Sequence, residues 1–299
     1  MNSTFYLNGI NTIFSYRIIH HTTILVLVIL SLASCSSTRL LYEFFDNFIE
    51  DEVSFFVEMN KEENILMSQQ VSEAVSWHRS FMLPSYSEYL IDAANMLENG
   101  NYDEIYINKI MSNGKSLIEE TIVGLTPYAS KFLMSHQSTK AINYMEKKME
   151  KRRKERLKEI SQSDEILYSK RLDRLKSNFE RFFGSLTDKQ VDLIKAYATA
   201  TLHDSKVRLQ NRTLRQRAFI EFMRTQPTLT ELNKYLNKLL LSGHQITNPS
   251  YESFSQISLK LFSELLVNVL IISSKTQREK IESKLRDYAK DFDSISSVK

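Results

Sequence analysis

The chain has 299 residues, a formal net charge of +3 at pH 7, 42% hydrophobic residues and 25% charged residues. These values are typical of a globular protein long enough to bury a large core, and the small net charge argues against a dedicated nucleic-acid-binding protein. Cys35 is its one cysteine, so no disulfide bond within the chain can stabilise the fold. The 6 glycines and 4 prolines favour long helices over sheets. We therefore predict an all-α fold: a multi-helix, bundle-like single domain.

Residues 1–34 have the pattern of a secretory signal peptide. Arg17 precedes an uninterrupted apolar run at 24–30, and small residues follow up to Cys35. The run is too short for a transmembrane helix, which needs about 20 apolar residues. The string at 32–35 resembles the lipobox of bacterial lipoproteins, in which the cysteine is lipidated and becomes the new N-terminus.

This resemblance implies that residues 35–299 form a periplasmic domain held at the membrane by lipid, palmitate included, on Cys35. Ser36 stands where lipoproteins of the inner membrane typically carry aspartate, so the resemblance favours the inner leaflet of the outer membrane. Segment 39–49 is amphipathic, and the domain is expected to begin within a few residues of the anchor. The alternative is an incidental cysteine after an ordinary signal peptide. The long n-region leaves the true start codon open.

Four later segments have apolar residues at three- and four-residue steps, which predicts amphipathic helices. Their apolar positions are Ile142, Met145, Met149, Leu157 and Ile160; Leu172, Leu175, Phe179 and Phe182; Val191, Ile194, Ala198 and Leu202; and Ile281, Leu285, Tyr288 and Phe292. Segment 257–272 is apolar on all sides, which predicts a buried central helix. We expect the chain to turn at Pro84, and Pro127, Pro227 and Pro249 to lie between helices.

Helix starts are marked by capping boxes, in which the first side chain accepts from an early backbone N–H and the fourth reaches back to the cap. Asn60–Glu63, Thr187–Gln190 and Ser274–Gln277 fit this pattern, and 134–137 is a degenerate fourth instance. Related sequences follow Gln190 and Gln277, which indicates a loosely repeated cap-plus-helix unit. The alternative is that these are ordinary helix starts without a functional role.

Several short strings spread over the chain resemble an uncharacterised family of bacterial helical lipoproteins, a domain of unknown function. They are Arg39-Leu40-Leu41-Tyr42, Trp77-His78-Arg79, Leu83-Pro84-Ser85-Tyr86, Arg171 and Arg174 leading into Gly184-Ser185-Leu186-Thr187, Gln277-Arg278, and Leu285-Arg286-Asp287-Tyr288-Ala289. The chain departs from the family pattern at Phe182-Phe183, where tryptophan is common, and at 134–137. The resemblance implies an envelope address and a helical fold, with no catalytic residue to carry over. A fainter likeness, at 186–190, is to periplasmic helical chaperones with Leu-Thr-x-x-Gln motifs.

Trp77, His78 and Arg79 form the most conspicuous cluster of candidate binding residues. An indole, a titratable imidazole and a guanidinium would suit a binding site near the end of a helix. The alternative is a buried tryptophan with His78 and Arg79 hydrogen-bonded or solvated beside it. Successive helical residues diverge by about 100°, so the three side chains cannot share one face.

No catalytic, metal-ligating or cofactor-binding residues can be named from the sequence. The histidines outside the signal, His78, His136, His203 and His244, have no partner histidine at ligand spacing. Nucleophile motifs and a glycine-rich phosphate loop are also missing. We therefore expect no metal site and no cofactor, and we lean towards a protein that is not an enzyme.

The segment 146–159 holds eight basic and four acidic residues, including Lys151, Arg152, Arg153 and Lys154. A second basic set comprises Lys206, Arg208, Arg212, Arg215 and Arg217. The simplest interpretation is a solvated helix with ion pairs such as Glu150–Lys154. The sharper hypothesis is contact with an anionic envelope polymer or lipid headgroups, where each basic residue is worth roughly 1 kcal/mol before screening. The second set extends the patch if the fold brings the two together.

We expect an outer-membrane lipoprotein with a non-enzymatic periplasmic body that binds or scaffolds an envelope partner, with chaperone-like surface chemistry as one form of this. The first alternative is an enzyme acting on cell-wall or lipid material in a groove between helices. The second is a purely structural envelope lipoprotein. A pocket of converging polar side chains that includes Trp77 or His78 would favour the enzyme, and an exposed apolar or basic groove would favour the binding protein.

Overall fold

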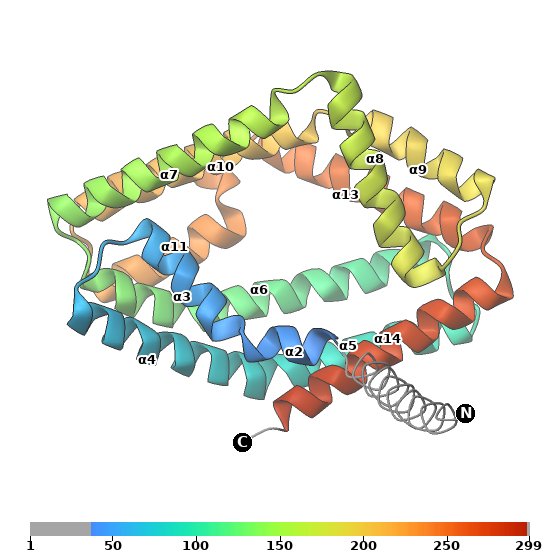
Figure 1. Cartoon of the computed structure of the whole chain (residues 1–299), viewed down its shortest axis with the longest axis horizontal. Coiled ribbons are helices and arrows are strands. Elements are labelled where there is room, and N and C mark those ends of the chain that lie inside the picture. Colours follow the sequence, from blue (N-terminus) through green and yellow to red (C-terminus); the bar gives the residue numbers. More distant parts are fainter. Residues whose placement is uncertain (1–36, 298–299) are drawn as a thin grey trace, which may run out of the picture. The chain divides into compact units, whose positions relative to one another are not determined.

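The computed structural model describes residues 37–297, and in this range the chain is helical, with no strand (Figure 1). The predicted all-α fold is thereby confirmed. The signal peptide and Cys35 lie outside the described residues. The chain divides into two units between Phe44 and Phe45, and residues 37–44, with helix α2 (Ser37–Glu43), are the described part of the first.

The second unit is built of long helices joined by short connections. In chain order they are α3 (Phe45–Phe56), α4 (Lys61–Trp77), the π-helix η1 (His78–Met82), α5 (Leu83–Glu98), α6 (Glu104–Met134), α7 (Thr139–Ile160), α8 (Asp164–Phe183), α9 (Asp188–Ala200), α10 (Asp204–Arg224), α11 (Leu229–Ser242), α12 (His244–Thr247), α13 (Tyr251–Ile271) and α14 (Lys275–Ser296). The most extensive helix pairs are α5 with α14, α6 with α11, and α7 with α10.

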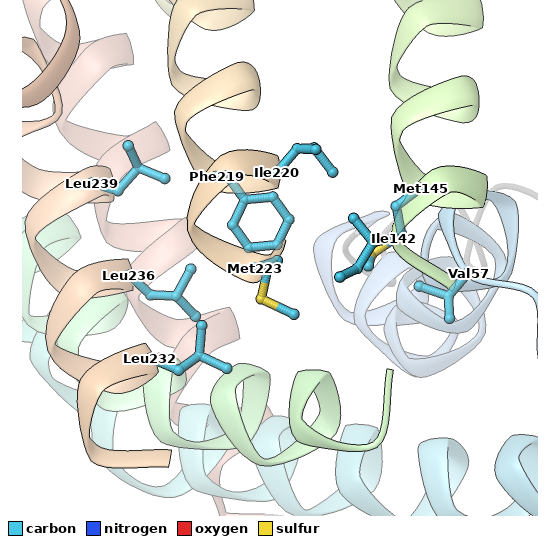
Figure 2. Packing of buried hydrophobic residues seen from close by; sticks show 9 residues of the cluster. All are labelled: Val57, Ile142, Met145, Phe219, Ile220, Met223, Leu232, Leu236 and Leu239. Carbon is cyan, nitrogen blue, oxygen red and sulfur yellow. The ribbon is translucent and has the colours of Figure 1, made fainter. Parts of the chain in front are cut away.

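The core of this unit consists of two hydrophobic clusters. The first joins Val57 to buried residues of α7, α10 and α11, which point towards one another in Figure 2: Ile142, Met145, Phe219, Ile220, Met223, Leu232, Leu236 and Leu239. The second comprises Leu97, Ile107, Phe179, Phe183, Ile194, Leu265, Val269, Leu270 and Ile281. Helix α6, roughly 45 Å long at 1.5 Å per residue, supplies Ile107 to the second cluster and residues 132–134 to the edge of the first.

Three of the predicted capping boxes are confirmed, at the starts of α4, α9 and α14. The fourth, at 134–137, is wrong: Ser138 caps α7, and Gln137 Nε2 instead donates to the Pro227 carbonyl at 2.8 Å. Gln137 therefore joins the α6–α7 connection to the start of α11. A further box, Thr228 with Glu231, opens α11 and was not predicted from the sequence.

The boxes of α9 and α14 meet in space. The buried amides of Gln190 and Gln277 exchange two hydrogen bonds, of 3.1 and 3.0 Å. Each amide oxygen also accepts the N–H of its own cap residue at 3.0 Å. Gln277 Nε2 further donates to the Ser185 carbonyl at 2.9 Å. The two related segments thus pair through glutamine, the polar residue that they have in common.

Two proline expectations are wrong. Pro127 lies inside α6, and the chain does not turn at Pro84, because α4, η1 and α5 follow one another without a break from Lys61 to Glu98. Pro84 is the second residue of α5 and lies directly after the π-helical turn. The π-helical turn before it changes the hydrogen-bond register and so admits the proline.

Helix α13 is not buried on all sides, contrary to the expectation for 257–272. Leu265, Val269 and Leu270 are buried, but Ile257 is 59% and Ile271 is 56% exposed. Helices α6 and α9 pack against α13, and its uncovered face carries Lys260, Glu264 and Asn268 as well as the two exposed isoleucines. Of the described helices, only α13 has the length and apolar composition that a membrane span requires, which is weak evidence because core helices of soluble proteins pass the same test.

Candidate functional site

Helices α7 and α10 pack side by side and bring the two basic segments of the sequence together (Figure 1). Contacts between Arg224 and Asn143 at one end, and cavity walls shared by Arg208 and Glu159 towards the other, make the pair antiparallel. Two adjoining cavities, of about 630 and 290 Å³, lie along this pair. We call them together the arginine groove; its arginines are Arg152, Arg153, Arg156, Arg208, Arg212 and Arg215.

The charges of the arginine groove are only partly compensated. Arg152 contacts Glu52 of α3 at 3.4 Å, and Arg208 contacts Asp204 at 3.5 Å. Arg156 pairs with Glu159 on its own helix. Within residues 37–297 neither Arg153 nor Arg212 forms an ion pair or a side-chain hydrogen bond. The two cavities are lined by three glutamates, Glu52, Glu155 and Glu159, against six arginines. The groove is therefore an electropositive site with two uncommitted guanidinium groups.

Arg215 is positioned by the end of α11. Its Nη1 donates to the Leu239 carbonyl at 3.4 Å. A Cβ atom at Gly243 would lie 2.4 Å from Arg215 Cδ and 2.2 Å from the same carbonyl oxygen. Glycine at 243 therefore makes the room in which the Arg215 side chain passes into the groove.

The predicted basic residues at 151–154 divide between two surroundings. Arg152 and Arg153 line the arginine groove, and the Arg152 guanidinium also lies 4.3 Å from the centroid of Phe55. Lys151 approaches the same ring at 5.8 Å, and Lys154 pairs with Glu150 at 2.8 Å. The ion-pair interpretation is thus confirmed for Lys154, whereas Arg152 and Arg153 line the arginine groove.

The second basic set divides in the same way. Arg208, Arg212 and Arg215 line the arginine groove, because their spacing of four and three residues places them on one face of α10. Arg217 lines a neighbouring cavity with Arg153, and Lys206 is exposed outside both. The spacing within α10 was visible in the sequence. The pairing of α10 with α7 was not, because it depends on the packing of segments some fifty residues apart.

Trp77, His78 and Arg79 do not converge on any of the cavities described here. The Trp77 indole packs on Gly124 of α6, where a Cβ would lie 1.9 Å from the ring, and stacks with Phe81 at 6.2 Å between centroids. His78 lies between Phe45 and Tyr86, with ring centroids 6.2 and 5.6 Å away. Burial in this aromatic surrounding lowers the pKa of His78 below its usual 6.5.

Acidification is expected to destabilise the protein through His78. The unfolded chain takes up a proton near its ordinary pKa, whereas the folded chain does so only at lower pH, so stability is lost as the pH falls below about 6.5. His78→Gln should flatten the decline of the melting temperature between about pH 7.5 and 5.5, followed by circular dichroism. Ser76→Gln, at an exposed position two residues before His78, is the control; an unchanged pH profile for the His78 variant would contradict this assignment.

Among residues 37–297 no group of three histidine, cysteine or acidic side chains is placed to hold a metal ion. His203 lies 3.6 Å from Asp164 as an isolated pair. Gln190, the last residue of the chaperone-like string at 186–190, is buried in the pair with Gln277. That string is therefore accounted for by the fold, and its glutamine offers no surface to a client protein.

Family comparison bears on the segment that contains this site. A family model matches residues 55–252. The chain belongs to the family of unknown function DUF6279. The matched region includes all six arginines of the groove, whereas the family-like strings at 39–42 and 277–289 lie outside it. No curated protein matches the chain, and no solved structure matches it.

This DUF6279 protein has a larger cavity away from the groove. It measures about 1020 Å³ and is lined chiefly by apolar residues of α5, α6 and α13, among them Tyr89, Met111, Ile118, Leu259 and Phe262. It shares no lining residue with the arginine groove. Two pairs of its polar side chains contact each other: Ser263 donates to Asn108 at 2.7 Å, and Lys260 lies 3.8 Å from Glu264.

Proposed function

We propose that this protein is a lipid-anchored envelope protein whose non-enzymatic helical body binds an anionic partner through the arginine groove. The observation that carries the proposal is the convergence of six arginines from α7 and α10 against three glutamates. Guanidinium groups are planar, always charged and suited to bidentate pairing with phosphate or carboxylate oxygens. An anionic group held there would form charge-assisted hydrogen bonds that water alone does not supply.

Two features support a binding protein over an enzyme. The basic groove is open and exposed, and the cavities described above do not include Trp77 or His78 in their walls. The groove itself carries arginines, which stay protonated and so do not serve as acid–base groups. Anchoring rests on the lipobox resemblance of Cys35, and Ser36 favours the outer membrane with the body in the periplasm.

Cys35→Ala should release the protein from the membrane. Without the thioether there is no lipid, and the body is expected to move from the membrane pellet to the soluble periplasmic fraction and to lose incorporation of labelled palmitate. Fractionation followed by immunoblotting measures this. Ser36→Ala, which keeps the cysteine, should leave the protein in the pellet. Retention of the Cys35 variant in the pellet would show that another part of the chain holds it there.

Inorganic pyrophosphate is expected to bind the full-length lipidated protein in phosphatidylcholine nanodiscs, measured by isothermal titration calorimetry. Arg153→Glu with Arg212→Glu should weaken this binding at least about tenfold, since charge-assisted hydrogen bonds contribute roughly 1.5–3 kcal/mol each. These two arginines have no ion pairs within the described residues, so their loss leaves no carboxylate stranded. Added salt should weaken binding as well.

The matched control is Lys234→Glu with Lys238→Glu, which makes the same change in charge on the exposed face of α11. Equal weakening by both double variants would assign the binding to net charge and would contradict a specific groove. No binding by the unchanged protein would remove the proposal.

A further inference from the structure

An apolar cavity of about 490 Å³ adjoins the arginine groove. Its volume lies within the range of about 300–1,000 Å³ that is typical of small-molecule sites. Side chains of α3, α4, α6, α7 and α10 line it, and they are apolar or aromatic except for Glu52 and Gln70. Val57, Met145 and Phe219 belong both to this wall and to the first hydrophobic cluster (Figure 2).

The apolar cavity and the arginine groove meet at α3. Glu52 and Phe56 line the apolar cavity and also the smaller cavity of the groove. The Arg152 guanidinium lies 5.6 Å from the centroid of the Phe56 ring. A molecule lying across this junction would therefore touch hydrocarbon on one side and guanidinium groups on the other.

Helices α7 and α10 each change along their length from apolar residues in the apolar cavity to arginines in the groove. On α7, Met145 and Met149 line the apolar cavity, and Arg153 and Arg156 follow at four- and three-residue steps in the groove. On α10, Phe219 lines the apolar cavity. Arg215 and Arg212, at four- and three-residue steps before it, line the groove. Because the helices are antiparallel, the apolar part of α7 lies beside the apolar part of α10.

Gln70 is, with Glu52, one of the two polar residues of the cavity wall. Its Oε1 is buried and accepts no hydrogen bond within the described part of the chain.

We propose that the apolar cavity and the arginine groove together bind a single-chain lipid with a phosphate headgroup, the chain in the cavity and the phosphate among the arginines. This proposal rests on the proposed function, because it uses the same groove for the anionic group. One chain is expected, since the larger cavity beside α13 shares no lining residue with the groove. Phosphate is preferred to carboxylate because its several oxygens can engage more than one guanidinium group.

The test uses Trp77, the one tryptophan of the chain, as its reporter. Ala74 of the cavity wall lies one turn before Trp77, and Leu125 of the wall follows Gly124, on which the indole packs. Lysophosphatidic acid with a brominated chain is added to the full-length lipidated protein in phosphatidylcholine nanodiscs. We expect saturable quenching of Trp77 fluorescence. For brominated lysophosphatidylcholine and for a brominated fatty acid of equal chain length, the concentration that gives half-maximal quenching should be at least about tenfold higher.

Substitutions at Ala74, at Arg153 with Arg212, and at Glu52 assign the two parts of the ligand. Ala74→Phe fills the cavity and should abolish quenching while pyrophosphate binding persists; Ala74→Leu is the milder substitute if thermal melting shows that the phenylalanine variant does not fold. Arg153→Glu with Arg212→Glu should weaken quenching by lysophosphatidic acid at least about tenfold. Glu52→Gln frees Arg152 from its carboxylate and should strengthen binding.

The outcomes separate this proposal from the proposed function. Pyrophosphate binding without saturable quenching overturns the lipid site and leaves the anion-binding groove standing. If neither pyrophosphate binding nor saturable quenching is seen, the proposed function and the lipid site are both overturned. Equal quenching by lysophosphatidylcholine or by the fatty acid overturns the phosphate assignment, and undiminished quenching in a folded Ala74 variant overturns the placement of the chain.

Discussion

Replacing Gln190 alone by leucine is expected to lower the free energy of unfolding by about 2–4 kcal/mol, because a helix cap contributes roughly 1 kcal/mol and a stranded buried amide costs about 1–3 kcal/mol. Gln190 is fully buried, and its oxygen accepts both the Thr187 N–H and Gln277 Nε2. Leucine removes all of these bonds and leaves the Gln277 amide facing an apolar side chain. Gln277→Leu should behave alike for the same reason.

The double variant Gln190→Leu with Gln277→Leu should recover part of this loss. Removing both partners leaves no unpaired amide between the two glutamine positions, and only the glutamine side-chain bond of each capping box remains lost. Chemical denaturation of the three variants completes a double-mutant cycle, with a coupling energy of roughly 0.5–3 kcal/mol expected. Gln69→Leu, at an exposed position of α4, is the control for introducing leucine. Strict additivity of the two losses would argue that the glutamines act only as separate caps.

The second large effect is expected at Gly124. Alanine there would place its Cβ 1.9 Å from the Trp77 ring, and the ring is held between α4 and α6. Overpacking of this kind costs typically about 1–3 kcal/mol, and the better helix propensity of alanine offsets about 1 kcal/mol of it. We expect a clear net drop in the melting temperature, accompanied by a change in Trp77 emission.

Trp77→Leu in the Gly124→Ala background tests the cause. The smaller side chain removes the clash, so Gly124→Ala should cost much less when Trp77 is absent than when it is present. Ala129→Gly on the same helix measures the propensity term separately. A Gly124→Ala variant as stable as the original protein would show that the indole moves without cost.

Short sequence patterns predicted the structure correctly where that structure depends on only a few neighbouring residues. Capping boxes at Asn60, Thr187 and Ser274 mark helix starts because both of their hydrogen bonds form within four residues. The degenerate instance at 134–137 failed because Gln137 finds a better acceptor in the Pro227 carbonyl, ninety residues away. Pro127 and Pro84 were misplaced because proline disfavours a helix locally without excluding one that packing stabilises.

Part of the candidate site could be recognised from the sequence. Both basic segments were recognisable, and the spacing of Arg208, Arg212 and Arg215 placed them on one face. The division of residues 151–154 between groove and surface was hidden, since it depends on where α3 and α10 lie against α7. Trp77, the most conspicuous residue, turned out to pack on a glycine of another helix.

By itself, the sequence determined the helical class, the starts of α4, α9 and α14, and membership of a family, because few glycines and prolines, apolar periodicity and capping boxes act over one or two turns. Only the tertiary structure decided that α7 lies antiparallel to α10, that Gln190 meets Gln277, and that an apolar cavity adjoins the arginines. Contacts of this kind join residues far apart in the chain. They depend on how whole helix faces pack, and no short string of residues encodes that.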